Sequence, residues 1–220
     1  MPFTPGVECS GTIISIGIGH DNGNSISGSH NDTSSTPHHN LKPGDLVMAY
    51  APSGAYAAYT VAPISKTYAL STTSTTPAIA PQRAAATLIG GLTALTLIRE
   101  AHPVKPDDWV LVPAAAGGTG QWLCQLLRAT GARVIGTAST DAKLEVARAA
   151  GASAVLNSTA TSEDELVAEV MKLTEGKGVV AAFDGVGRAT FECSMRCLGR
   201  KGTMVTFGNA SGPVPDVAPL

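Results

Sequence analysis

Apolar runs of strand length alternate with segments of helical period from Trp109 to Gly208. The runs read WVLVPA, ARVIGTA, SAVLN, VVAAFD and GTMVTFG, and glycine, proline or polar residues bound them. Helical segments near residues 119–130, 141–150, 162–174 and 188–198 separate the runs. Strands that alternate with helices need right-handed crossovers and a parallel sheet that is covered on both faces. The pattern therefore predicts a doubly wound α/β domain with five strands in the order 3-2-1-4-5.

Residues 1–80 show a different pattern, that of short β-strands broken by glycine and proline. The strand candidates are VECSGTIISIG, LVMAY, GAYAAYTVAP and SKTYAL. The period becomes helical at Pro81, where PQRAAATLIGGLTALTLIREA predicts a helix with a weak point at Gly90–Gly91. We therefore expect two domains, residues 1–80 and residues 81–220.

A polar stretch, residues 18–40, interrupts the first of these domains. It contains four of the five histidines, but they do not have the spacing of metal ligands. The stretch has few apolar residues whose burial could offset the entropy of ordering it. We interpret it as a mobile surface loop.

The composition excludes several classes of protein. Hydrophobic residues make up 44% of the chain and charged residues 15%, as in a globular protein with a sizeable core. The formal net charge of −2 leaves no basic face for nucleic acid, and no apolar run approaches the roughly 18 residues of a membrane span. The four cysteines form no disulfide framework, and Cys193 and Cys197 fit buried thiols better than a zinc site. We expect a cytoplasmic protein.

The stretch VLVPAAAGGTGQWLCQ, residues 110–125, places three glycines between the first strand and the first helix of the α/β domain. Dinucleotides bind at such a turn, because small residues allow a tight bend, close approach of the pyrophosphate and close helix–strand packing. Aligned with G-x-G-x-x-G, the chain has Ala115, Gly117 and Gly120, so the first glycine is missing. The following helix offers free N–H groups to an anion. We therefore expect a dinucleotide site, although glycine turns also serve as ordinary connections.

The end of the second strand indicates which dinucleotide binds. NAD sites have an acidic residue there for the ribose hydroxyl, whereas this chain has no carboxylate before Asp141. Ser139 or Thr140 could cap the next helix, and Lys143 could be a solvated charge. However, a lysine in the first turn of a helix is electrostatically unfavourable unless an anion such as a 2′-phosphate lies beside it. The sequence therefore favours NADPH.

Several segments together resemble a known family. In chain order they are PGVECSGTIISIG, KPGDLV, AAATLIGGLTA, VLVPAAAGGTG, GTASTDAK, FDGVGRATFECSMRCLGRKG and FGNASG. They are similar to the zinc-independent quinone oxidoreductases, the zeta-crystallin-like group of the medium-chain dehydrogenase/reductase superfamily. The resemblance covers nearly the whole chain apart from the polar stretch. It implies a partial GroES-like catalytic β-domain over 1–80, a Rossmann-type NADPH-binding domain over 81–220, and a quinone or activated enone as hydride acceptor.

The resemblance also implies which residues bind the cofactor. The pyrophosphate would lie on a run of small residues: Ala116, Gly117, Gly118, Thr119 and Gly120. The adenosine 2′-phosphate would face polar side chains: Ser139, Lys143 and Ser158. The nicotinamide end would be enclosed by Thr93, Phe207, Gly208, Asn209 and Ser211.

Some of these assignments leave alternatives open. Ser158 stands where relatives often have Tyr or His, so its role is not fixed by the resemblance. Phe207 could belong to the core, and Gly208 and Ser211 could simply form a turn. Asp184, at the end of VVAAFD, fits a structural role as well as a position at the cofactor.

The resemblance argues against a metal. Zinc-using relatives carry Gly-His-Glu where this chain has Gly6-Val7-Glu8, and their four-cysteine lobe has no counterpart. Without a Lewis acid or an evident general base, reduction of an acceptor that needs only a hydride and a solvent proton is expected. No catalytic residue is assigned.

The resemblance also predicts that family segments are missing at both ends, including the last Rossmann strand. Residues 203–207 would then form a sheet edge, which another chain could cover in a homo-oligomer. Three functions remain open: an NADPH-dependent quinone oxidoreductase, an enone or alkenal reductase on the same scaffold, and an NADPH-binding module with little or no catalysis.

Overall fold

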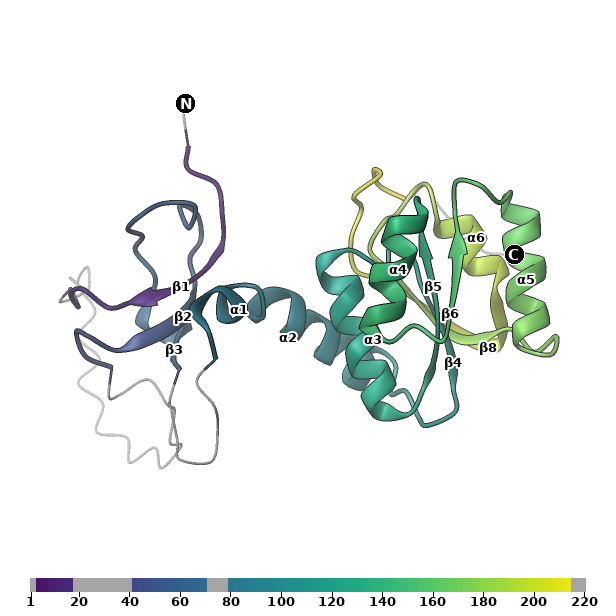
Figure 1. Ribbon diagram of the computed structural model, residues 1–220, viewed down its shortest axis with the longest axis horizontal. Helices are drawn as coiled ribbons and strands as arrows, with labels where there is room; N and C mark the ends of the chain where they lie inside the picture. Colours follow the sequence, from purple (N-terminus) through teal and green to yellow (C-terminus); the bar gives the residue numbers. More distant parts are fainter. Residues whose placement is uncertain (1–2, 18–40, 71–78, 215–220) are drawn as a thin grey trace, which may run out of the picture. The chain divides into compact units, whose positions relative to one another are not determined.

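The computed structural model describes residues 3–17, 41–70 and 79–214 (Figure 1). The polar stretch 18–40 lies outside these residues, so the loop interpretation stays a prediction. The chain divides into two compact units, Met1–Ile89 and Gly90–Leu220. Within the described ranges, no helix combines the length and the apolar character that crossing a membrane requires.

The first unit contains a three-stranded antiparallel sheet in the order β1-β2-β3. Its strands are β1 (Glu8–Thr12), β2 (Leu46–Tyr50) and β3 (Thr67–Ala69), and a short 3₁₀ helix, Ile64–Lys66, precedes β3. A turn precedes β2, in which the Lys42 amide donates to the Asp45 carboxylate over 2.9 Å. This sheet fits a partial GroES-like β-domain, as expected from the sequence.

One predicted strand, GAYAAYTVAP, is wrong. Residues 54–63 form bends and loops instead. Tyr56, Tyr59 and Val61 are 76%, 79% and 89% exposed. An alternating run forms a stable strand only when one of its faces is buried, and here the apolar side chains remain in solvent.

The helix predicted after Pro81 is divided at a different place from the one expected. It forms α1 (Pro81–Ala85), α2 (Leu88–Thr96) and a π-helical turn, Leu97–Ala101. The break lies at residues 86–87, and Gly90 continues α2. A Cβ atom on Gly90 would lie 3.2 Å from Cδ1 of Trp122. This glycine therefore serves close packing and does not interrupt the helix.

The second unit is built on a five-stranded parallel sheet (Figure 1). Its strands are β4 (Trp109–Val112), β5 (Arg133–Ala138), β6 (Ala154–Asn157), β7 (Val179–Asp184) and β8 (Leu198–Thr206). Their order is β6-β5-β4-β7-β8, which confirms the predicted 3-2-1-4-5 arrangement and the Rossmann-type fold. In the described part of the chain β8 pairs only with β7, so it is an edge strand.

The helices between the strands are α3 (Gly118–Thr130), α4 (Asp141–Ala150), α5 (Glu163–Leu173) and α6 (Phe191–Arg196). The first three agree with their predicted positions, and Gly151 ends α4 in the left-handed conformation with φ = +117°. The fourth is shorter than predicted, because residues 188–190 form a turn before it.

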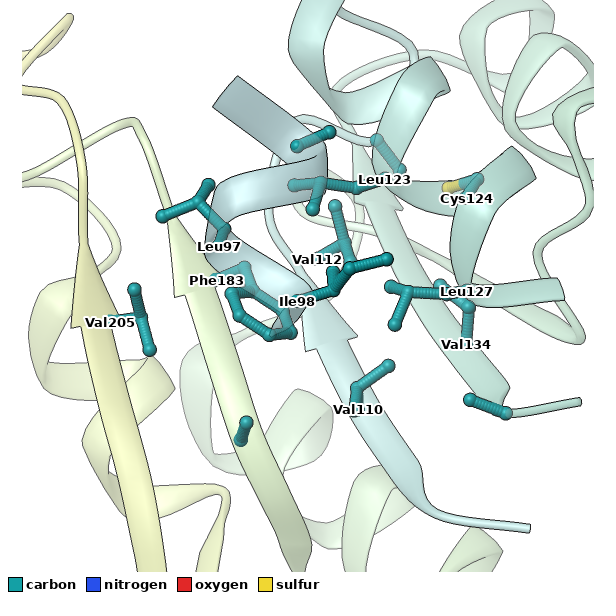
Figure 2. Packing of buried hydrophobic residues seen from close by; sticks show 14 of the residues in the cluster. Leu97, Ile98, Val110, Val112, Leu123, Cys124, Leu127, Val134, Phe183 and Val205 are labelled. Atoms are coloured by element: carbon teal, nitrogen blue, oxygen red, sulfur yellow. The ribbon is translucent and has the colours of Figure 1, made fainter. Parts of the chain in front are cut away.

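Among the described residues, the core of the second unit consists of two apolar clusters, one on each face of the parallel sheet. Side chains of a strand point alternately to its two faces, so Val110 and Val112 belong to one cluster and Leu111 to the other. Figure 2 shows the first cluster, in which Phe183 and Val205 from the strands meet Leu97, Ile98, Leu123 and Leu127 from the helices. α5 and α6 supply the second cluster. Both faces are buried, as a doubly wound sheet requires.

Candidate functional site

The carboxyl ends of the parallel strands bring together most of the segments singled out in the sequence. β4 leads into the glycine turn, β5 into residues 139–143, β6 into Ser158, and β8 into residues 207–211. The strand order reverses between β4 and β7, since the chain runs from β4 outward to β6 and then returns to β7. Ligands of open α/β sheets bind at such a reversal, outside the carboxyl ends of the strands.

The turn after β4 is tight despite its missing first glycine. Ala114 adopts a positive φ of 51°, which is uncommon for a residue with a side chain. The Ala115 amide donates to the Thr137 carbonyl over 2.9 Å and ties the turn to β5. The Gln121 side chain donates to the Ala116 carbonyl over 2.9 Å. Gln121, which no sequence motif singles out, thus holds the turn against α3.

The glycines of this turn differ in what surrounds them. A Cβ atom on Gly120 would meet the Ala114 carbonyl oxygen and lie 2.9 Å from the Ala115 Cα, so α3 can approach the turn only with glycine here. A Cβ atom on Gly118 would have no atom within 4 Å apart from its chain neighbours and the backbone of its own helix. Gly120 therefore serves packing within the fold, whereas Gly118 faces open space in which a ligand could lie.

The N-terminus of α3 has no cap from its own side chains. Its N-cap residue is Gly117. The first hydrogen bond of the helix runs from the Gln121 amide to the Gly117 carbonyl over 2.9 Å. The amides of Gly118, Thr119 and Gly120 precede this bond and have no acceptor within the helix. Such amides, together with the helix dipole, form a site for an anion.

The N-termini of α4 and α5 are capped instead. The Thr140 hydroxyl accepts from the Lys143 amide over 3.4 Å, so Thr140 and not Ser139 caps α4. At α5, Ser162 and Glu165 form a capping box. The backbone amide of Ser162 donates to the Glu165 carboxylate over 2.9 Å and, together with the Ser162 hydroxyl, lowers the pKa of Glu165.

Three exposed polar residues lie at the ends of β5 and β6: Ser139, Lys143 and Ser158. The Ser158 amide donates to the Ala138 carbonyl over 2.9 Å, which places Ser158 beside the end of β5. Lys143 takes part in none of the five ion pairs found in the described residues.

Asp141 in the same region already has a partner. Its carboxylate accepts from the Asn157 side-chain amide over 2.9 Å. The side-chain oxygen Oδ1 of Asn157 in turn accepts from the backbone amides of Thr159 and Ala160, over 3.0 and 3.1 Å. Asn157, which no sequence motif singles out, therefore fixes Asp141 at the start of α4.

The segment after β8 packs on the segment after β7. The Phe207 amide donates to the Asp184 carbonyl over 3.0 Å, and a Cβ atom on Gly185 would lie 2.6 Å from the Phe207 ring. The Ser211 hydroxyl donates to the Val186 carbonyl over 2.8 Å. It also accepts from the Ala189 amide over 2.9 Å. Ser211 thus has a structural role in this turn, while Asn209 is exposed.

Thr93 and the cysteines lie away from these turns in the sequence. Thr93 is half-buried in α2. Cys193 and Cys197 are buried free thiols, as expected, and burial raises the pKa of Cys124 to about 11. A hydrogen bond with Cys197 lowers the pKa of the Cys193 thiol. In the described ranges no three His, Cys, Asp or Glu residues gather as metal ligands would.

Comparison with known proteins shows which proteins the chain is similar to. Residues 118–220 match the family described as zinc-binding dehydrogenase. A probable quinone oxidoreductase of Schizosaccharomyces pombe is 41% identical over 220 residues, which are 100% of this chain and 58% of that protein. A 2-haloacrylate reductase of Burkholderia is 41% identical over 125 residues, 57% of this chain and 37% of the reductase.

The solved structures agree with the sequence comparison. Escherichia coli quinone oxidoreductase in complex with NADPH superimposes with a TM-score of 0.81 and 35% identity over 99% of this chain and 59% of that one. This chain thus spans somewhat more than half the length of the Schizosaccharomyces pombe and Escherichia coli proteins. In sequence and in fold, the chain is similar to these quinone oxidoreductases.

Proposed function

We propose that this chain is an NADPH-dependent oxidoreductase that transfers a hydride to a quinone without zinc. Residues 81–220 would form the NADPH-binding domain and residues 1–80 the partial GroES-like catalytic domain. The observation that carries the proposal is the uncapped N-terminus of α3 at the point where the strand order reverses. The similarity to an oxidoreductase solved with NADPH supports it.

The pyrophosphate of NADPH would bind the turn Ala116–Gly120. The open space at Gly118 fits a group that approaches the backbone, because no protein atom lies where a side chain would stand. The free amides of the first turn of α3 would donate to the phosphate oxygens, and the helix dipole would stabilise their charge. Gly120 would contribute indirectly, because it lets α3 pack against the turn.

The adenosine end would bind at Ser139, Lys143 and Ser158. Lys143 is exposed and forms no ion pair in the described residues, so its ammonium group is available to a 2′-phosphate. Asp141 is held by Asn157. The carboxylate that NAD sites direct at the ribose hydroxyl thus has no counterpart directly after β5, and this supports NADPH over NADH.

The nicotinamide end would lie between Thr93 and the segment 207–211. Phe207, Gly208 and Asn209 follow β8, and the glycine turn follows β4. Both segments therefore lie at the carboxyl ends of the parallel strands. Bound NADPH would supply the hydride, and the protein would contribute orientation and exclusion of water. Because reduction of a quinone needs only this hydride and a proton from solvent, no residue is assigned to acid–base catalysis.

Zinc independence rests on residues of the first unit. Val7 occupies the place where the Gly-His-Glu motif has its histidine. The neighbouring Glu8 carboxylate accepts from the Ile89 amide at the start of α2 over 2.8 Å, so it has a structural partner. The four cysteines are free thiols, consistent with a reducing compartment such as the cytoplasm.

Steady-state assays test the proposal. NADPH oxidation by the purified chain is measured with a simple ortho-quinone and, in parallel, with an enone, while a titration measures NADPH binding. Quinone-dependent oxidation is expected. Oxidation with the enone alone would support the reductase alternative, for which the similarity to 2-haloacrylate reductase speaks. Binding without oxidation of NADPH would reduce the function to that of a binding module.

A further inference from the structure

Asp184, the last residue of β7, has no exposed surface and accepts four hydrogen bonds. One carboxylate oxygen accepts from the backbone amides of Val186 and Gly187, over 2.8 and 3.0 Å. The other accepts from the hydroxyl groups of Thr190 and Ser194, over 2.7 and 3.0 Å. The carboxylate thus determines the path of the chain from β7 to α6.

No cation balances this buried charge in the described part of the molecule, since Asp184 is absent from its five ion pairs. A buried carboxylate is costly unless hydrogen bonds replace its hydration. Four donors do so here, and charge-assisted bonds of this kind are stronger than neutral ones. The arrangement defines one conformation of the segment 185–190.

The segment 185–190 supports the segment after β8. Ser211 is bonded to Val186 through both its amide and its hydroxyl, each over 2.8 Å. The Arg188 amide donates to the Gly212 carbonyl over 3.1 Å. The Cβ that Gly187 lacks would lie 2.9 Å from the Asn209 Cα, so the two backbones are in close contact. A change in the path after Asp184 would therefore displace residues 207–212.

We propose that Asp184 is a positioning residue for the nicotinamide end of NADPH. It acts through residues 185–190 on Phe207, Asn209 and their neighbours and does not itself touch the cofactor. This inference rests on the proposed function, because it takes residues 207–211 as the nicotinamide-facing segment. The sequence allows either a structural role for Asp184 or a position at the cofactor. The inference makes Asp184 a structural residue whose loss weakens cofactor binding.

The test compares two ligands on the Asp184→Asn variant. Asparagine keeps the size of the side chain and can keep the two backbone hydrogen bonds, but it replaces the oxygen that accepts from Thr190 and Ser194. NADPH affinity is expected to fall by about tenfold. Adenosine 2′,5′-bisphosphate, which carries only the adenosine end, should bind within about twofold of the wild type.

Thr174→Val is the matched control. Thr174 is also buried, and its hydroxyl donates to the Val170 carbonyl and accepts from the Gly178 amide, just before β7 begins. This variant removes a buried polar network at the other end of the same strand. It should lower the unfolding temperature but leave both affinities unchanged.

The possible outcomes separate the inference from the proposed function. A wild-type chain that binds neither ligand would refute the proposed function, and the inference with it. If the wild type binds both and Asp184→Asn weakens both equally, or weakens neither, Asp184 does not position the nicotinamide end. Should Asp184→Asn fail to fold, Ser194→Ala removes one donor to the same oxygen and is expected to lower NADPH affinity alone, by about threefold.

Discussion

The N-termini of α3 and α5 differ in how their free backbone amides are capped. At α5, Ser162 and Glu165 form a capping box that satisfies the free backbone amides from within the chain. At α3, the N-cap is Gly117, and no side chain caps the helix. Both helices follow strands of one sheet, α3 the central strand β4 and α5 the edge strand β6. Under the proposed function the amides of α3 bind the pyrophosphate, whereas those of α5 serve only the fold.

The largest effect is expected for Gly120→Ala, which tests whether the α3 turn depends on close packing. The added Cβ would overlap with the backbone of Ala114 and Ala115. The free energy of unfolding should fall by roughly 1–3 kcal/mol, the usual cost of overpacking. Chemical denaturation measures it, and an unchanged midpoint would show that α3 can move away from the turn without cost.

Gly118→Ala separates the binding role of this turn from its packing role. No atom lies within 4 Å of the added Cβ, so stability should stay the same or rise by up to about 1 kcal/mol. The new methyl group would occupy space assigned to the pyrophosphate, and NADPH affinity should fall by at least about tenfold. A calorimetric titration measures the affinity. Unchanged binding would place the pyrophosphate elsewhere.

Lys143→Ala tests the charge at the start of α4. NADPH affinity should fall by about tenfold while NADH affinity stays within about twofold, because only NADPH carries the 2′-phosphate. Lys172→Ala is the control. It removes an exposed lysine from the last turn of α5, far in sequence from the start of α4. An equal loss for both nucleotides would contradict the assignment of Lys143 to the 2′-phosphate.

Ser162→Ala tests the opposite side of the comparison. Loss of the capping hydroxyl should lower the free energy of unfolding by about 1 kcal/mol. NADPH affinity should not change, because this cap serves the fold alone. Thermal unfolding measures the stability, and a titration on the same sample measures the NADPH affinity. A loss of affinity would contradict the view that the N-terminus of α5 serves only the fold.

The smallest effect is a pH dependence at α5. The folded-state pKa of Glu165 is lowered, so the folded state favours the ionised carboxylate. Its contribution to stability is therefore complete above the pKa of the unfolded chain and is lost as the pH falls through the lower folded-state pKa. Glu165→Gln, which cannot ionise, should show a shallower loss of stability in this acidic range. If the free energy of unfolding fell equally steeply with pH in the wild type and in Glu165→Gln, this expectation would be contradicted.

The sequence predicted the sheet better than the connections around it. All five strands of the parallel sheet and their order follow from alternating periods, because strands buried on both faces leave a clear apolar signal. The run at residues 54–63 carried the same kind of signal, but its side chains are exposed. Local pattern cannot show whether a partner face exists, and this explains the error.

A candidate site could be predicted from the sequence, but the hydrogen bonds that support its residues could not. The glycine turn and the ends of the strands are visible as motifs. In contrast, the bonds from Gln121 to Ala116 and from Asn157 to Asp141, and the four bonds to Asp184, connect residues whose approach depends on the folded chain. Gly90 shows the same limit, since its contact with Trp122 joins two separate helices.

Amide chemical shifts of the labelled chain, recorded with and without NADPH, test the central claim most directly. The account predicts that the amides of Gly118, Thr119 and Gly120 shift most, and that the amides at the start of α5, from Glu163 to Glu165, do not move. Saturable NADPH binding that leaves the α3 amides unchanged would contradict it.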